Sequence, residues 1–101
     1  MSWASSYIPQ LQAGHTVSFR PRGHSMRPHI KSGQLVTVEP FAEGAVPEVG
    51  DIVLSRVRGA DYLHFVRGIR DGQVLIGNAH GHENGWTSFA KVFGKVTVVA
   101  D

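Results

Sequence analysis

The sequence predicts a mostly-β protein with few short helices, and three features lead to that expectation. Apolar residues recur with a period of two rather than 3.6, which is typical of strands. Short runs rich in Val, Ile and Phe follow one another closely, separated by turns that contain glycine or proline. No segment has a convincing amphipathic helical pattern. Many short strands at close spacing indicate a coiled sheet or a small barrel.

Six runs are expected to form the strands. They cover residues 16–20, 34–39, 51–57, 62–70, 73–77 and 92–100. The pair Asp71-Gly72 between two of these runs is a strong signal for a tight hairpin. A single turn is expected over 25–30, and a short helical turn near Ser88. Residues 1–14 are polar with isolated aromatics, which predicts an N-terminal arm, either loose or formed as a short helix, ahead of one domain at 15–101.

Size and composition exclude several classes of protein. A chain of 101 residues suffices for one domain with a modest core. The formal net charge is only +2 and the cations are scattered, so we expect no nucleic-acid partner. The absence of cysteine excludes disulfides, a thiol nucleophile and thiolate metal ligands. No apolar stretch approaches the roughly 20 residues needed to cross a bilayer, and the N-terminus lacks the pattern of a secretory signal. We therefore expect a soluble, cytoplasmic protein without a membrane anchor.

The stretch most informative about function runs from Gly23 to Val36. A strand ends at a Pro/Gly turn, Ser25 sits on that turn, and the chain resumes as a strand after Gly33. A serine at such a corner exposes its hydroxyl, and neighbouring backbone N–H groups can converge on one point, as in an oxyanion hole. For an isolated serine, capping of the following turn would be the simpler interpretation.

The pattern Gly-x-Ser-Met-x-Pro-x-Ile-x-x-Gly-x-x-Val resembles the nucleophile box of the LexA-like and type I signal peptidases, a superfamily of serine peptidases. The matching residues are Gly23, Ser25, Met26, Pro28, Ile30, Gly33 and Val36. Residues 49–54 are similar to the family's second strand box, and 92–96 to its closing strand. The resemblance implies coiled β-sheets with a small SH3-like barrel, and it implies Ser25 as the nucleophile. The residues implied to lie around the bound substrate are Gly23, His24, Met26 and Pro28.

A serine hydroxyl needs a base to remove its proton. Most of the superfamily uses a lysine on a later strand, but the matching segment here, 62–69, has His64 at that position, and no lysine lies between Lys31 and Lys91. This resembles the histidine-bearing variant in archaeal and endoplasmic-reticulum signal peptidases. A lysine would need its pKa lowered by roughly three units, at about 4 kcal/mol, to act at neutral pH. Because an imidazole begins near 6.5, it needs almost no shift.

A third group should accept a hydrogen bond from the second ring N–H of His64. The resemblance places an Asp in the corresponding stretch, but this chain has Asn78 there. Glu83 is the only nearby carboxylate, and Asn84 or His82 offers a weaker orienting group. We therefore predict a Ser25–His64 dyad, with Glu83 as the candidate third member.

The resemblance therefore implies a soluble serine endopeptidase, without a cofactor, that processes a dedicated partner protein. His-x-His and His-x4-His spacings among His24, His29, His80 and His82 can also ligate zinc, but solvated loops often carry such residues, and we predict no metal site. Two other functions stay open. The chain could be an inactive binding module on a peptidase fold, or a self-processing peptidase cutting at Ala13-Gly14. The sequence does not indicate an oligomeric state.

Overall fold

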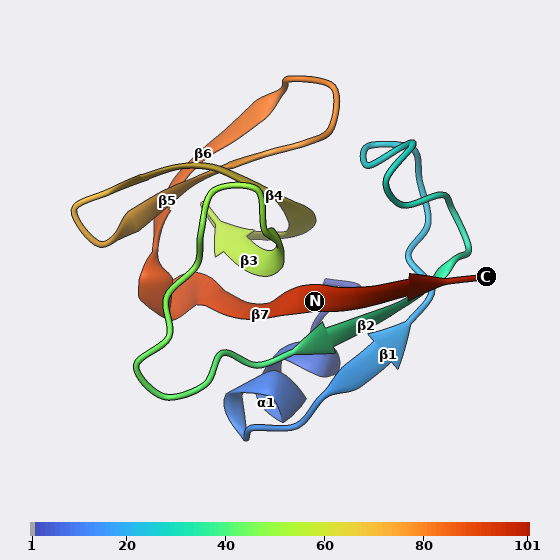
Figure 1. The fold of residues 1–101 in the computed structure, drawn as a ribbon, viewed down its shortest axis with the longest axis horizontal. Coiled ribbons are helices and arrows are strands. Elements are labelled where there is room, and N and C mark those ends of the chain that lie inside the picture. The colour runs from blue at the N-terminus through green and yellow to red at the C-terminus, as the bar shows by residue number, and fades with distance from the viewer. Residues whose placement is uncertain (1) are drawn as a thin grey trace.

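The computed structural model describes residues 2–101 and folds them as one seven-stranded antiparallel sheet with a short α-helix (Figure 1). The elements in chain order are α1 (Tyr7–Gln12), β1 (Val17–Phe19), β2 (Leu35–Glu39), β3 (Ile52–Val57), β4 (Ala60–Arg70), β5 (Gln73–Gly77), β6 (Glu83–Ser88), a 3-10 turn η1 (Phe89–Lys91) and β7 (Val92–Ala100). The strand order is β1-β2-β7-β3-β4-β5-β6. The prediction of a mostly-β fold with few short helices is confirmed.

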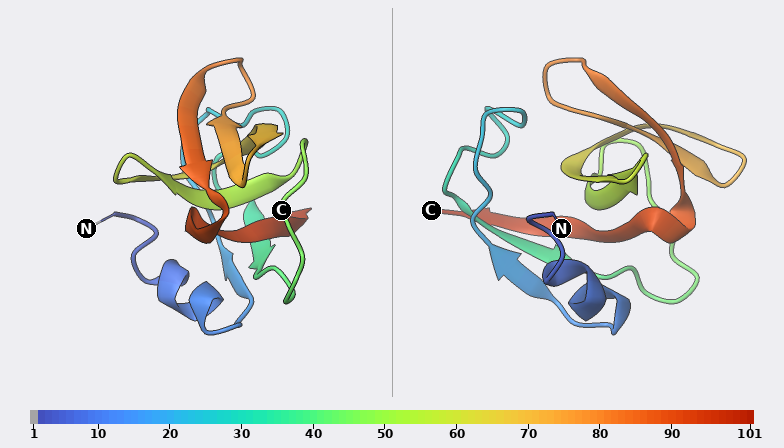
Figure 2. Two further views of the ribbon diagram at one scale, coloured as in Figure 1. Left: turned by 90° about the vertical axis from the view of Figure 1, so that its left-hand side faces the viewer. Right: turned by 180° about the vertical axis from the view of Figure 1, so that it is seen from behind.

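Strand β7 joins the two halves of the sheet. Its first part pairs with β3 through Val92, Gly94 and Lys95, and its second part pairs with β2 as far as Ala100. The sheet coils around this long strand, so that β1 and β2 lie to one side of it and β4 to β6 to the other (Figure 2). In the described part of the chain β1 and β6 are the two edge strands, and the expected SH3-like barrel stays a prediction.

Two apolar clusters form the core because adjacent residues on a strand point to opposite faces of the sheet. On β3, Leu54 belongs to the first cluster and Val53 to the second, and both are fully buried. Helix α1 contributes Ile8 and Leu11 to the first cluster. None of the helices among residues 2–101 is long and apolar enough to cross a membrane.

The N-terminal segment forms a short helix, α1, rather than a loose arm; the sequence had left both open. Ala4 is fully buried in the first cluster, together with Ile8 and Leu11, so this segment packs on the sheet and belongs to the same core as residues 15–101.

The predicted hairpin at Asp71-Gly72 is present between β4 and β5. Both residues have positive φ angles, 51° and 75°, as a type I′ turn requires. Strand β6 is not among the six predicted strands, because Gly81 before it and Gly85 within it favour a turn. It nevertheless pairs along β5, and the Thr87 hydroxyl donates to the carbonyl of Arg56 at 2.7 Å, which fixes β6 against β3.

Candidate active site

Ser25 lies on an exposed turn that two buried side chains attach to the core. Met26 and Ile30 are only 5% and 3% exposed and belong to the first apolar cluster, whereas Ser25 itself is solvent-accessible. The turn is closed by hydrogen bonds from the Arg27 N–H to the His24 carbonyl and from the Ile30 N–H to the Met26 carbonyl. The serine hydroxyl is thus presented outward from an anchored loop.

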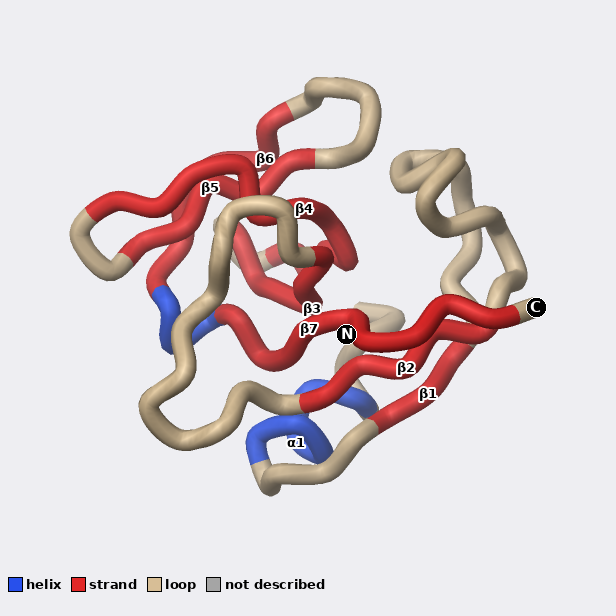
Figure 3. The backbone as a smooth tube through the Cα atoms, in the orientation of Figure 1, coloured by secondary structure: helices blue, strands red, loops and turns tan. Residues whose placement is uncertain are grey.

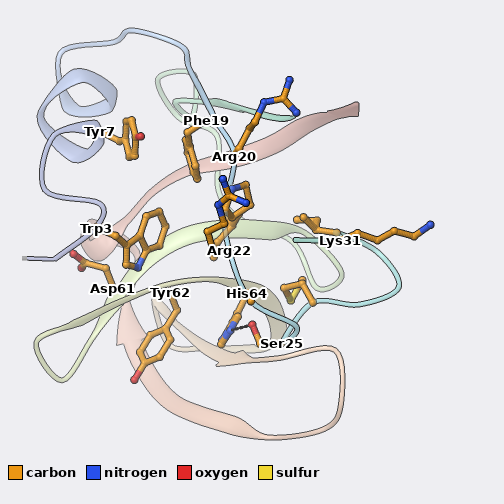
Figure 4. A pocket seen from close by; sticks show the side chains of 15 residues that line it. Trp3, Tyr7, Phe19, Arg20, Arg22, Ser25, Lys31, Asp61, Tyr62 and His64 are labelled. Carbon is orange, nitrogen blue, oxygen red and sulfur yellow. Dashed lines mark hydrogen bonds between the residues drawn. The ribbon is translucent and has the colours of Figure 1, made fainter. Parts of the chain in front are cut away.

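The structure brings Ser25 and His64 within hydrogen-bonding distance although 39 positions separate them. The Ser25 Oγ lies 3.1 Å from Nε2 of His64, as the dashed line in Figure 4 marks. His64 lies on β4 opposite Val53 and is 8% exposed, so the sheet fixes the backbone from which the ring projects. The hydroxyl can donate its proton to Nε2, which is the first requirement for a base-activated serine.

The other ring nitrogen of His64 contacts Asn84 on β6. Nδ1 lies 2.7 Å from Oδ1 of Asn84. A carbonyl oxygen can only accept, so Nδ1 carries the hydrogen, and Nε2 keeps its lone pair toward Ser25. An amide fills this orienting place in some cysteine peptidases. The three side chains therefore form a chain of hydrogen bonds across strands β4 and β6 and the serine turn.

The surroundings of His64 favour the neutral imidazole. Burial lowers the pKa of His64 below its usual value, the hydrogen bond to Asn84 acts in the opposite direction, and the charge of His82 lowers it further. The ring of Tyr62 stacks on the imidazole, with centroids 5.1 Å apart and planes inclined by 29°. A neutral, sterically confined imidazole is the form that can accept the serine proton.

A loop at 78–82 holds the serine turn from the opposite side. The N–H of Ala79 donates to the Ser25 carbonyl at 2.9 Å, and Nε2 of His80 lies 3.0 Å from the His24 carbonyl. Figure 3 shows these two loops facing each other on one side of the sheet. The contacts fix the backbone on both sides of the Cα of the serine.

Asn78 organises this loop from within. Its Oδ1 accepts hydrogen bonds from the N–H groups of His80 and His82, at 2.8 and 3.0 Å. Arg67 donates to the Asn78 carbonyl at 2.6 Å. Gly77 permits the close return of the chain, because a Cβ there would lie 2.9 Å from the carbonyl oxygen of His82. Asn78 thus has a structural role in the position where the family resemblance led us to look for an acidic residue.

Backbone donors are available beside the hydroxyl. Within residues 2–101, neither the N–H of Ser25 nor that of Met26 donates to a protein acceptor. N–H groups that have no protein acceptor and lie next to a serine hydroxyl are the donors that an oxyanion would require.

Ser25 and His64 line a cleft of about 600 Å³. Aromatic side chains from the N-terminal segment and β1 form the wall of the cleft opposite the Ser25–His64 pair (Figure 4). The rings of Tyr7 and Phe19 stack with their centroids 4.4 Å apart, and the centroid of the Trp3 ring lies 5.5 Å from that of Phe19. The sequence did not identify this wall, because it is assembled from separate segments. It gives the site room for several residues of an extended ligand.

Two of the four residues expected around the substrate line this cleft, and two do not. Gly23 and Met26 are part of its wall. His24 and Pro28 are exposed and are not among the residues that line it, and the carbonyl of His24 is bonded to His80.

Glu83 requires a correction as third member of the triad. Its side chain is exposed, and within residues 2–101 it makes no hydrogen bond to His64. The pairing of β6 with β5 shifts register here, with Gly85 opposite Ile76 and Glu83 opposite Gly77. Asn84 is therefore the extra residue of a β-bulge, and it is Asn84, not Glu83, that reaches the ring. The type of side chain favoured Glu83, but its position on β6 excludes it.

The histidine spacings do not assemble into a metal centre in the described part of the chain. No group of three or more His, Asp or Glu side chains there is arranged to hold a metal ion. His80 instead bonds to a backbone carbonyl.

Comparison with family models and with curated protein sequences gives no match to this chain.

Proposed function

We propose that the protein is a serine endopeptidase of the LexA-like and type I signal peptidase kind, with Ser25 as nucleophile and His64 as general base. The observation that carries the proposal is the hydrogen-bonded series from Ser25 Oγ through the imidazole to Asn84, at 3.1 and 2.7 Å. Its position on the wall of a cleft gives a substrate access to the hydroxyl. The motif around Ser25, which resembles the family's nucleophile box, supports the same assignment.

In the proposed reaction Oγ of Ser25 attacks a peptide carbonyl while Nε2 of His64 accepts the hydroxyl proton. The N–H groups of Ser25 and Met26 stabilise the negative charge that develops on the carbonyl oxygen. The imidazolium, held by Asn84, then donates its proton to the leaving amine. A water molecule, deprotonated by the same imidazole, releases the acyl group from Ser25.

The substrate we propose is a peptide segment of a dedicated partner protein, with small side chains next to the scissile bond. The preference for small residues follows from the family resemblance.

Labelling with a fluorophosphonate probe tests the assignment without knowledge of the substrate. We expect intact-mass analysis to show one adduct on the wild type and none on the Ser25→Ala or His64→Ala variants. Ser6→Ala is the matched control, because the hydroxyl of Ser6 is exposed and makes no capping hydrogen bond. If the wild type carries no adduct at high probe concentration, the peptidase proposal fails and an inactive binding module becomes the better interpretation.

Self-processing at Ala13-Gly14 receives less support. The N–H groups of both residues are bonded to carbonyls of the preceding helix, Ala13 to Pro9 and Gly14 to Leu11, at 3.0 Å each. A serine peptidase requires an accessible, extended peptide, so α1 would have to unwind before cleavage there. An unchanged intact mass after days at alkaline pH would exclude this activity.

A further inference from the structure

The cleft beside Ser25 carries an excess of positive charge. Four charged side chains line it: Arg20, Arg22, Lys31 and Asp61. The single carboxylate is already satisfied, because Asp61 accepts a 2.8 Å hydrogen bond from Arg56 and another from Ser2, and its side chain is 1% exposed. None of the three cations forms a salt bridge within residues 2–101.

The fold brings these cations together from two segments. The N–H of Gly33 donates to the Pro21 carbonyl at 2.8 Å, and Nη1 of Arg20 donates to the Gly33 carbonyl at 2.8 Å. The guanidinium of Arg22 also lies beside Gly33, 3.6 Å from the place where a Cβ would stand. The three cations are exposed, and the contacts of Arg20 and Arg22 with Gly33 hold the segment before Ser25 against the segment after it.

Arg22 is the cation placed to meet a bound substrate. In Figure 4 it lies between Phe19 and the Ser25–His64 pair, whereas Arg20 and Lys31 extend outward from that region. A guanidinium at this point can bind a carboxylate with two hydrogen bonds. The neighbouring aromatic wall, where Trp3 is 48% exposed, offers an apolar surface to the adjacent substrate side chain.

From this arrangement we infer the substrate class: a peptide segment with an acidic side chain close to the scissile bond and an apolar side chain beside it. The carboxylate pairs with Arg22, within the field of Arg20 and Lys31, and the apolar group packs on Trp3. This inference rests on the proposed peptidase function and adds to its preference for small residues next to the cut.

A peptide fits this surface better than a nucleic acid does. Binding of single strands depends on free aromatic faces on which successive bases stack. Here Tyr7 and Phe19 already cover one another in a parallel stack, with planes inclined by 14°. Three cations also provide little charge for a polyphosphate chain.

Peptide binding to the Ser25→Ala variant tests the inference without requiring turnover. The probes are three fluorescent seven-residue peptides, identical except for one position, occupied by glutamate, glutamine or lysine, next to a leucine. At low ionic strength we expect the glutamate peptide to bind about tenfold more tightly than the lysine peptide, and the difference to shrink with added salt.

Two charge reversals locate the effect. The variant that also carries Arg22→Glu should lose or invert the preference. Lys91→Glu changes the net charge by the same amount on the exposed turn η1, away from the cleft, and should leave the preference unchanged.

The inference would be overturned if the three peptides bound equally. It would also be overturned if Arg22→Glu and Lys91→Glu reduced the preference for the glutamate peptide equally. An oligothymidylate that binds tighter than the glutamate peptide and displaces it would overturn it as well. These results are independent of fluorophosphonate labelling of wild type, so the substrate class can fail while the peptidase proposal stands, and the converse is equally distinguishable.

Discussion

Asn84 provides the most direct test of how the candidate site works, because its side chain can be changed in two chemically opposite ways. It accepts the hydrogen bond of Nδ1 of His64 at 2.7 Å. That bond strengthens when the ring becomes protonated, since a charged donor contributes about 1.5–3 kcal/mol and a neutral one about 0.5–1.5 kcal/mol. The difference, about 1–2 kcal/mol, is the stabilisation that Asn84 gives to the imidazolium over the imidazole.

For Asn84→Ala this difference predicts a fluorophosphonate labelling rate that falls roughly 5- to 30-fold, because 1.36 kcal/mol corresponds to a factor of ten. The bond to Asn84 raises the pKa of His64 against the effect of burial, so its loss should also move the acid limb of the rate profile to lower pH. The assay is the second-order labelling rate from pH 4.5 to 9, followed by intact mass.

Asn84→Asp should act in the other direction. A carboxylate at this position stabilises the imidazolium, raises the pKa of His64, and moves the acid limb to higher pH. The more basic imidazole should label at least as fast as wild type above that limb. Glu83→Gln is the control on the neighbouring exposed residue and should stay within about twofold of wild type.

The reasoning is refuted if Asn84→Ala labels at the wild-type rate, or if Asn84→Asp shifts the limb downward. A large loss in Glu83→Gln with none in Asn84→Ala would return the orienting role to the carboxylate.

Four further outcomes follow from the geometry. Because burial lowers the pKa of His64, the wild-type labelling rate should be constant above about pH 7 and decline only on the acid side of about 6.5; a limb centred above pH 7 would contradict this. The unfolded chain binds that proton more readily, so the free energy of unfolding by urea should fall as pH drops below about 6.5, and less so in His64→Gln. His80→Ala removes the contact with the His24 carbonyl and should slow labelling several-fold without moving the acid limb; a shifted limb would mean that His80 acts on the base instead. Leu54→Ala on the central strand β3 should lower the free energy of unfolding by about 2–5 kcal/mol, and a loss below 1 kcal/mol would show that the core collapses around the site.

The strands were predictable from the sequence where a buried face imposes alternation. The runs at 34–39 and 51–57 correspond closely to β2 and β3, because their apolar side chains fill the two clusters. Strand β6 has no such run, and Gly85 has a φ of 129°, so pairing with β5 and the bond from Thr87 hold a segment whose own sequence favours a loop. Strand β6 forms because of its contacts with β5 and β3, which the sequence of residues 83–88 alone does not reveal.

The same limit explains what could be predicted of the site. Ser25 and His64 each lie in a short sequence motif, so both could be predicted from the sequence alone. Asn84 acquires its role only because β6 lies beside β5 in the folded sheet and turns that one residue toward the ring. Side-chain chemistry favours Glu83, whereas the β-bulge in β6 decides which of the two adjacent residues reaches the imidazole. The aromatic wall, made from Trp3 and Tyr7 of the N-terminal segment and Phe19 of β1, likewise has no local signal.

Met26 connects the stability of the fold with the geometry of the dyad. It follows the serine directly, lines the cleft, and is 5% exposed within the first apolar cluster. Its burial opposes any outward motion of the turn, while the N–H of Ala79 holds the Ser25 carbonyl from the other side. A smaller side chain at this position would weaken only the first of these restraints and would leave a cavity that the exposed turn can relax into. The 3.1 Å contact between Oγ and Nε2 should therefore loosen before the sheet unfolds, because His64 is fixed by β4 whereas Met26 is one of the restraints that hold the serine turn.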